Sequence, residues 1–192
     1  KLSSVDKLPD FEDLYSSAKF LIDNKINIID VCGIGRIFDV IGVFCGVGIY
    51  NYYEGQIPCL CEFYAARKFN YVRNKNLVYE YEVKKKDECY IVNTKGLLKK
   101  IFDDVILHNE KKENILAKFH LTLLYTTVDV VLKIREELGI NKVVLSGGVF
   151  QNKIFFENLI DLLKKENFEV YYHKNFPTND ACISAGQSLA VS

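Results

Sequence analysis

The chain is 192 residues long, 49% of its residues are hydrophobic, and its 25 basic side chains balance its 25 acidic ones. This length fits one domain or two small lobes, with enough apolar residues for a sizeable core. A net charge near zero argues against a nucleic-acid or membrane partner, because such partners usually select a basic excess. No uninterrupted apolar run reaches the roughly 18 residues of a membrane span, and we therefore expect a soluble, cytoplasmic protein.

The cysteine and methionine content adds two expectations. None of the six cysteines belongs to a Cys-x-x-Cys pair, which is the short spacing that zinc sites use, so we expect buried free thiols. The chain has no methionine, even at position 1. We expect it to be part of a longer protein or to lack its first residues.

The first part of the chain, residues 1–110, is predicted to be mainly helical. Apolar residues at helical spacing predict four helices, over 10–25, 36–47, 54–68 and 96–107. Asp10 is the expected N-cap of the first helix, and Pro58 is expected to interrupt the third. The β-branched segment 24–32 is predicted to be a loop or a strand.

A β-hairpin is predicted within the same part. Alternating apolar and polar residues predict a strand over 77–83, a charged turn over 84–87 and a returning strand over 89–92. Three glycines in the second helix or just after it weaken it by about 1 kcal/mol each relative to alanine: Gly42, Gly46 and Gly48. This cost indicates that the helix packs closely against another backbone.

Residues 111–192 are predicted to form a βαβα nucleotide-binding core of the same domain. The expected elements are helix 114–138, strand 142–145, helix 152–166, strand 168–172 and helix 181–191. Gly139 is a typical C-cap for the long helix. Alternation of this kind predicts the α/β class, with strands joined in parallel by helical crossovers.

The strongest local signal for function is the junction after strand 142–145, where the sequence is SGGVFQN. Gly147 and Gly148 let the backbone approach a phosphate or adenosine without a Cβ in the way. Ligands of open α/β sheets bind beyond the carboxyl ends of strands, and the next helix directs free N–H groups at an anion. Asn152 is in position to donate to ribose or phosphate oxygens. Paired glycines also make ordinary turns, so both interpretations stay open.

Three further positions are candidate ligands, each with a structural alternative. Asp180 either caps the last helix or holds a divalent metal together with ligands from elsewhere. Arg36 either binds phosphate or pairs with Asp39. Glu54 either accepts from a ribose hydroxyl or a substrate amide, or is an acid at a helix start.

The three histidines form no His-x-x-x-His pair. His120 lies among apolar residues of the long predicted helix and is expected to be a packed core residue. His108 and His173 are isolated in the sequence and are expected at the surface. The chain therefore offers no self-contained histidine metal site.

Five segments together resemble the HypF family of carbamoyltransferases, along most of the chain from about Gly33 to Ala190. They are Gly35–Asp39 (GRIFD), Tyr53–Gln56 (YEGQ), Lys118–His120 (KFH), Ser146–Asn152 (SGGVFQN) and Asn179–Gln187. The resemblance implies the second half of an ASKHA-type domain, the architecture of actin, sugar kinases and Hsp70. It implies a mixed sheet with helical crossovers in addition to the helical part and the hairpin.

The resemblance also implies an activity. HypF enzymes convert carbamoyl phosphate and ATP into carbamoyl-adenylate and transfer the carbamoyl group to the C-terminal cysteine of HypE, in [NiFe] hydrogenase maturation. Gly147, Gly148 and Asn152 would then seat the adenylate, with Arg36 and Glu54 at the same site. Asp180 matches the family's late metal-binding aspartate, for Fe, Zn or Mg.

The family's other functional parts lie outside this sequence. The histidine pair that completes the metal site and the preceding N-terminal domains are expected in the rest of a longer protein. Ala181 and Cys182 stand where the family has glycines. Two alternatives remain: a nucleotide-binding or partner-binding module without turnover, and a threonylcarbamoyl transferase-like protein acting on tRNA.

Overall fold

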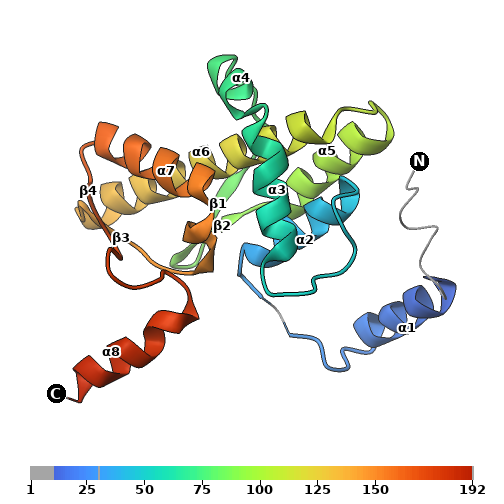
Figure 1. Cartoon of the computed structure of the whole chain (residues 1–192), viewed down its shortest axis with the longest axis horizontal. Helices are drawn as coiled ribbons and strands as arrows, with labels where there is room; N and C mark the ends of the chain where they lie inside the picture. The colour runs from blue at the N-terminus through green and yellow to red at the C-terminus, as the bar shows by residue number, and fades with distance from the viewer. Residues whose placement is uncertain (1–10, 30, 192) are drawn as a thin grey trace.

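The structure is a computed structural model that describes residues 11–29 and 31–191. Its elements are α1 (Phe11–Asp23), α2 (Gly35–Phe44), α3 (Gln56–Ala66), α4 (Phe69–Asn74), β1 (Val83–Lys86), β2 (Cys89–Val92), α5 (Thr94–Ile106), α6 (Lys112–Leu138), β3 (Lys142–Leu145), the 3-10 turn η1 (Gly148–Gln151), α7 (Lys153–Lys165), β4 (Glu169–Tyr172), the 3-10 turn η2 (Asp180–Cys182) and α8 (Ile183–Ala190). The expected α/β class is confirmed, and α1 and α8 lie apart from the body of the molecule (Figure 1).

Helix α6 forms the centre of the molecule and packs against α3, α4, α5 and α7 (Figure 1). It ends at Gly139, which adopts the predicted left-handed C-cap conformation with a φ of 67°. The largest buried side chains come from α2, α5, α6 and α7, and include Phe38, Ile41, Ile101, Leu116, Phe119, Leu124, Leu159 and Leu163. One core therefore extends across residue 110, and the division of the chain at that point stays a prediction.

By length and composition α6 is able to cross a membrane, but 56% of its most apolar window is buried inside the protein. Its apolar residues do not form one uninterrupted run, because polar residues such as the buried Thr122 and Thr126 lie among them. Each threonine hydroxyl donates to the carbonyl oxygen four residues earlier, at 2.7 and 2.8 Å. Burial of these satisfied hydroxyl groups in the molecule is typical of a central core helix.

The strands of the described chain form two separate two-stranded sheets rather than one continuous sheet. β3 and β4 are parallel, with Leu145 opposite Tyr172, and α7 provides the predicted crossover. Leu145 faces the core and is buried, while Val144 and Tyr171 are exposed. The other sheet is the antiparallel hairpin of β1 and β2.

The predicted hairpin is present, but it lies further along the chain. β1 begins at Val83 rather than at residue 77, and Lys84–Lys86, predicted to be a turn, belong to the strand. The reversal starts at Asp87, which has a positive φ of 53°, a conformation that Asp tolerates better than most residues. The prediction was wrong because residues 77–82 find hydrogen-bond partners outside a sheet.

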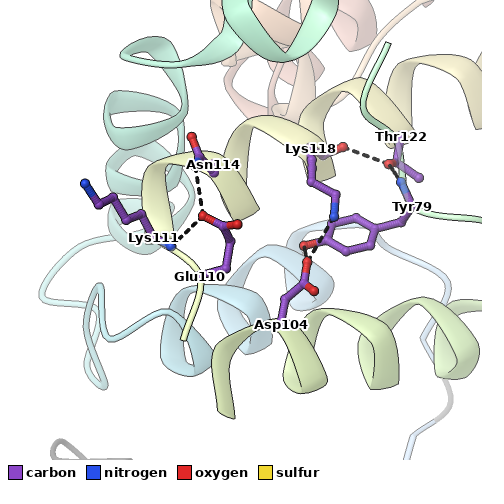
Figure 2. A network of polar contacts seen from close by, with 7 residues as sticks. All are labelled: Tyr79, Asp104, Glu110, Lys111, Asn114, Lys118 and Thr122. Carbon is purple, nitrogen blue, oxygen red and sulfur yellow. Dashed lines mark hydrogen bonds and ion pairs between the residues drawn. The ribbon is translucent and has the colours of Figure 1, made fainter. Parts of the chain in front are cut away.

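A polar network holds this extended segment against α5 and α6 (Figure 2). The N–H of Tyr79 donates to Thr122 Oγ1 at 2.9 Å, and its hydroxyl donates to Asp104 at 2.8 Å. Lys118 Nζ lies 3.0 Å from Asp104 and 4.0 Å from the Tyr79 ring centroid. Burial and the bond to Asp104 raise the pKa of Tyr79, so the phenol stays protonated and keeps its donor role.

The segments before the hairpin test two predictions, an interruption at Pro58 and a loop or strand over 24–32. Pro58 does not interrupt α3, because it lies in the first helical turn, where its missing N–H would have no intrahelical partner. Residues 24–29 form turns and coil, which is the loop alternative of the prediction for this segment. Asp10 lies outside the described residues, so its capping role stays a prediction.

Close packing is found at one of the three glycines, Gly42, although the neighbouring atoms belong to side chains and not to the backbone that we predicted. A Cβ added there would lie 2.2 Å from Ile57 Cγ2, so α2 and α3 approach closely because this residue is glycine. Gly46 follows α2 with a φ of 64°, and Gly48 has room for a Cβ. Neither of these two lies inside the helix.

All six cysteines are free, but only Cys61 is buried. Cys45 and Cys182 are half-buried, and Cys32, Cys59 and Cys89 are exposed. The expectation of buried thiols is therefore wrong for these three. The reason is plain for Cys59, because residues two apart on a helix lie on different faces and Cys61 occupies the inner one.

Candidate functional site

A pocket of about 410 Å³ brings distant segments of the chain together. Four of the predicted ligand residues line it: Arg36, Glu54, Gly148 and Asn152. One side is the strand-end wall, the loops 146–152 and 173–180 after β3 and β4, of which Gly148, Val149, Gln151, Asn152 and Asn179 line the pocket. The other side is the helical wall, residues 33–38 and 54–62. The volume is within the range of small-molecule sites.

The strand-end wall joins the loops that follow the two parallel strands. Gly147 has a φ of 118° and a ψ of 158°, a conformation that is essentially restricted to glycine. Its N–H donates to Thr178 O at 2.7 Å, while Ser146 Oγ lies 3.2 Å from His173 Nε2. These contacts fix the loops at the carboxyl ends of β3 and β4, where ligands of α/β sheets bind.

Two backbone N–H groups of this wall are available to a ligand. Gly148 and Val149 line the pocket at the start of η1, and their N–H groups have no acceptor among the described residues. A Cβ at Gly148 would lie 3.9 Å from Asn179 Cβ. Free N–H groups at the start of a helical turn favour an anion, so this edge of the pocket suits phosphate.

The N-terminus of α7, by contrast, is capped by the protein itself. Asn152 Oδ1 accepts from the N–H of Phe155 at 2.9 Å, and Glu62 Oε1 accepts from the N–H of Ile154 at 3.1 Å. The prediction that these N–H groups are free for an anion is therefore wrong. The available N–H groups lie one turn earlier, in η1.

The helical wall carries both predicted charged residues. Arg36 Nη2 lies 3.1 Å from Asp39 Oδ2 while its side chain remains 69% exposed, so this arginine both pairs with Asp39 and borders the pocket. Glu54 is exposed and lies in a loop that Asn51 shapes. Asn51 accepts from the N–H of Ile57 at 2.9 Å and donates to Asp39 at 3.3 Å.

His120 lies beneath both walls and is completely buried, as predicted for a core histidine. Its Nδ1 is 2.7 Å from Leu116 O, and its Nε2 is 2.9 Å from Asn152 Nδ2. The ring also packs edge-on against Phe38, with 5.3 Å between centroids, and Phe38 lines the pocket. Burial lowers the pKa of His120 to about 4, so the imidazole is neutral at neutral pH.

Asp180 is exposed at the start of η2, outside the residues that line the pocket. The cap of this turn is Asn179, whose Oδ1 accepts from the N–H of Ala181 at 3.3 Å. Within residues 11–29 and 31–191, no group of three His, Cys, Asp or Glu side chains could hold a metal. A metal at Asp180 would therefore need ligands from another part of a longer protein.

Several pocket residues were absent from the predicted ligands: Phe38, Pro58, Cys59, Glu62, Gln151 and Asn179. Glu62 has no local signal, because its partner Ile154 is 92 residues away. Asn179 does have one, since asparagine before a helical turn is a preferred N-cap.

Comparison with known proteins defines the class of this chain and its fold. Residues 6–187 match the family model described as "Carbamoyltransferase, Kae1-like Domain, second subdomain". The chain therefore belongs to the family that this second-subdomain model describes.

Individual relatives give the particular family. The chain is 30% identical over 172 residues to the probable carbamoyltransferase HypF of Methanocaldococcus jannaschii, covering 90% of this chain and 21% of that protein. It is 32% identical over 160 residues to the carbamoyltransferase HypF of Synechocystis sp., covering 81% and 19%. The chain belongs to the HypF family, and it spans about a fifth of the length of these relatives.

Solved structures agree with this assignment. A crystal structure of full-length HypF in the phosphate- and nucleotide-bound form matches 99% of this chain and 24% of that one, with a TM-score of 0.85 and 36% identity. HypF of T. kodakarensis matches with a TM-score of 0.79 at 21% identity, which supports the fold alone.

Proposed function

We propose that this chain supplies the nucleotide-binding half of a HypF-type carbamoyltransferase active site. The observation that supports the proposal most strongly is that Arg36, Glu54, Gly148 and Asn152 line one pocket. They come from three separate segments whose motifs resemble the family. A structural relative that was crystallised with phosphate and nucleotide adds independent support.

Each part of the pocket has a chemical role in this proposal. The N–H groups of Gly148 and Val149 and the guanidinium of Arg36 would bind phosphate oxygens, because preorganised donors stabilise developing negative charge. Glu54 would accept a hydrogen bond from a ribose hydroxyl or from the carbamoyl amide. Asn152 would donate to the ribose or a phosphate oxygen.

The complete reaction would require more than this chain. We propose that the longer protein uses ATP and carbamoyl phosphate to form carbamoyl-adenylate in the cytoplasm. It would then carbamoylate the C-terminal cysteine of HypE. The preceding domains would supply the remaining metal ligands and the carbamoyl phosphate chemistry. Asp180 would contribute one ligand to a divalent metal such as Fe, Zn or Mg, and none of the roles above depends on it.

Two measurements test the proposal. Isothermal titration of ATP into the 192-residue chain tests the pocket, and carbamoyl phosphate-dependent exchange between ATP and pyrophosphate tests the chemistry when the preceding HypF domains are supplied. Arg36→Ala is expected to weaken ATP binding about tenfold, the value of one charge-assisted contact. Arg73→Ala is the matched control, because Arg73 is exposed and bonds to Asn158 outside the pocket.

The outcomes separate the alternatives. The transferase is supported if ATP–pyrophosphate exchange occurs, if Arg36→Ala reduces it and if Arg73→Ala leaves it unchanged. ATP binding without exchange would indicate a nucleotide-binding module without turnover. Absence of ATP binding both alone and with the preceding domains would refute the proposal.

A further inference from the structure

His120 is a buried ionisable group that the proposed chemistry does not use, yet it touches the pocket from below. It is 0% exposed and contacts two pocket residues, Asn152 through Nε2 and Phe38 through its ring. Its other ring nitrogen bonds to Leu116 in its own helix. A buried histidine with both nitrogens engaged has its tautomer determined by its partners.

The partners of His120 select one tautomer. Leu116 O can only accept, so the Nδ1 atom 2.7 Å from it must carry the proton. Nε2 of the neutral ring is then an acceptor, and Asn152 Nδ2 donates to it at 2.9 Å. The same orientation of the Asn152 amide places Oδ1 at the N–H of Phe155. Each donor in this series of three hydrogen bonds, from Leu116 through His120 and Asn152 to Phe155, then faces an acceptor.

The opposite tautomer would disrupt this series at both ends. A proton on Nε2 would face the Asn152 amino group and force the amide to flip, which would turn Nδ2 toward the N–H of Phe155. The lone pair of Nδ1 would also face the carbonyl oxygen of Leu116. Because these groups are buried, water cannot compensate for an unsatisfied or opposed polar group, so this tautomer is disfavoured.

The fixed amide leaves one group for the pocket. Asn152 has two Nδ2–H groups, one of which goes to His120, and the other has no acceptor among the residues that the structure describes. We propose that His120, as the Nδ1–H tautomer, is a positioning residue that holds Asn152 as an N–H donor toward the ligand. This inference rests on the proposed nucleotide site and names the side chain that orients one of its ligands.

Burial of His120 supports the same conclusion. It disfavours the imidazolium and lowers the pKa of His120 to about 4. A protonated ring would present a second donor to Asn152 and reverse the amide. The neutral ring therefore keeps the donor orientation at neutral pH.

The tautomer is tested directly in the unmodified chain by ¹⁵N NMR with labelled histidine. The chain has three histidines, and the His120→Asn variant assigns the signal of His120 by its loss. At pH 7 we expect Nδ1 of His120 to be protonated and Nε2 to be an unprotonated acceptor. Protonation at Nε2 would overturn the inference whatever the variants do.

Two variants at this position separate positioning from packing. His120→Gln places an amide oxygen near the former Nε2 and retains an acceptor for Asn152, whereas His120→Asn retains only the bond near Leu116. We expect His120→Asn to weaken binding of ATP with Mg²⁺ about tenfold and His120→Gln to weaken it less than about threefold. Thr126→Val is the matched control, because it also removes a buried hydrogen bond within α6 but does not line the pocket.

Equal losses in His120→Asn and His120→Gln, or wild-type affinity in His120→Asn, would overturn the positioning role. A comparable loss in Thr126→Val would do the same, because destabilised α6 would then explain the effect. If the wild type binds no ATP, the proposed function fails, and the ¹⁵N tautomer alone then decides whether His120 orients Asn152.

Discussion

The two walls of the pocket are built in different ways. The strand-end wall depends on the conformation of single residues and on bonds between two neighbouring loops, such as Gly147 to Thr178. The helical wall depends on packing, because α2 and α3 meet closely at Gly42 and Ile57. Two side chains connect these parts. His120 contacts Phe38 of one wall and Asn152 of the other, and Glu62 of the helical wall bonds to Ile154, at the start of α7 directly after the strand-end wall.

This difference shows which changes each wall tolerates. A backbone conformation that requires glycine fails locally when a Cβ is added, while a close helix contact fails by displacing a neighbouring helix. A residue that joins the walls affects both of them. Each of these three cases can be tested, beginning with His120, for which we expect the largest change in the free energy of unfolding.

The first prediction concerns the pH dependence of stability that His120 provides. The pKa of His120 is about 4 in the folded chain and near its ordinary 6.5 when unfolded. Between these values the unfolded state binds a proton that the folded state does not, so stability falls as the pH decreases. The contribution of His120 to the free energy of unfolding is fully present above pH 6.5. Below pH 6.5 the free energy of unfolding falls by about 1.4 kcal/mol per pH unit, or by about 3 kcal/mol in total at pH 4.

Urea unfolding at pH 7, 6, 5 and 4 measures this effect by comparison with His120→Gln. The variant lacks the ionisable ring, so the difference between the two proteins isolates His120 from the other groups that titrate. Parallel pH profiles for wild type and variant would contradict the prediction and indicate that the buried ring is not the source of the acid sensitivity.

The second prediction tests the packing of the helical wall. Gly42→Ala is expected to lower the free energy of unfolding by about 2 kcal/mol, because its Cβ would lie 2.2 Å from Ile57 Cγ2 and overpacking costs 1–3 kcal/mol. The cost is expected to exceed the gain of about 1 kcal/mol in helix propensity. Gly48→Ala is the control, since its Cβ would meet Ile57 at an ordinary 3.7 Å. Equal stability of the two variants by urea unfolding would show that the helices adjust freely.

The third prediction tests the strand-end wall with two adjacent glycines. Gly147→Ala is expected to cost 1–2 kcal/mol of stability, because its backbone conformation is essentially restricted to glycine. Gly148→Ala is expected to change stability by less than about 0.5 kcal/mol, since its Cβ would lie 3.9 Å from Asn179. That Cβ would border the pocket, so Gly148→Ala should weaken ATP binding without destabilising the fold. Thermal unfolding and ATP titration of both variants check this; the reverse pattern would exchange the roles of the two glycines.

The sequence predicted the strand-end wall better than the helical wall, and locality is the reason. The C-cap at Gly139 and the strand 142–145 each follow from residues within one helical turn, and the structure confirms them. The role of Asn152 as N-cap of α7 was not predicted. Tertiary contacts decided the other cases. Residues 77–82 leave the hairpin because Tyr79 bonds to Thr122, and Glu62 joins the pocket through a bond to a distant helix. Alternation and periodicity do not encode such contacts. The chemistry of Arg36 and Glu54 made them candidate ligands with structural alternatives, and the resemblance of short motifs placed them at one site.

The last prediction concerns Glu62, which joins the walls with a charge. Its carboxylate accepts from the N–H of Ile154 at the N-terminus of α7, where a negative charge stabilises the helix by about 0.3–1 kcal/mol. Glu62→Gln keeps an acceptor but removes the charge, so stability should fall by no more than about 1 kcal/mol. Because Glu62 also lines the pocket, the loss of negative charge should strengthen binding of anionic ATP about threefold. Glu157→Gln is the control, since Glu157 is exposed on α7, the helix that Glu62 caps, and lies outside the pocket. Weaker ATP binding in Glu62→Gln would instead show that the carboxylate itself contacts the ligand, and would move the nucleotide from the strand-end wall toward α3.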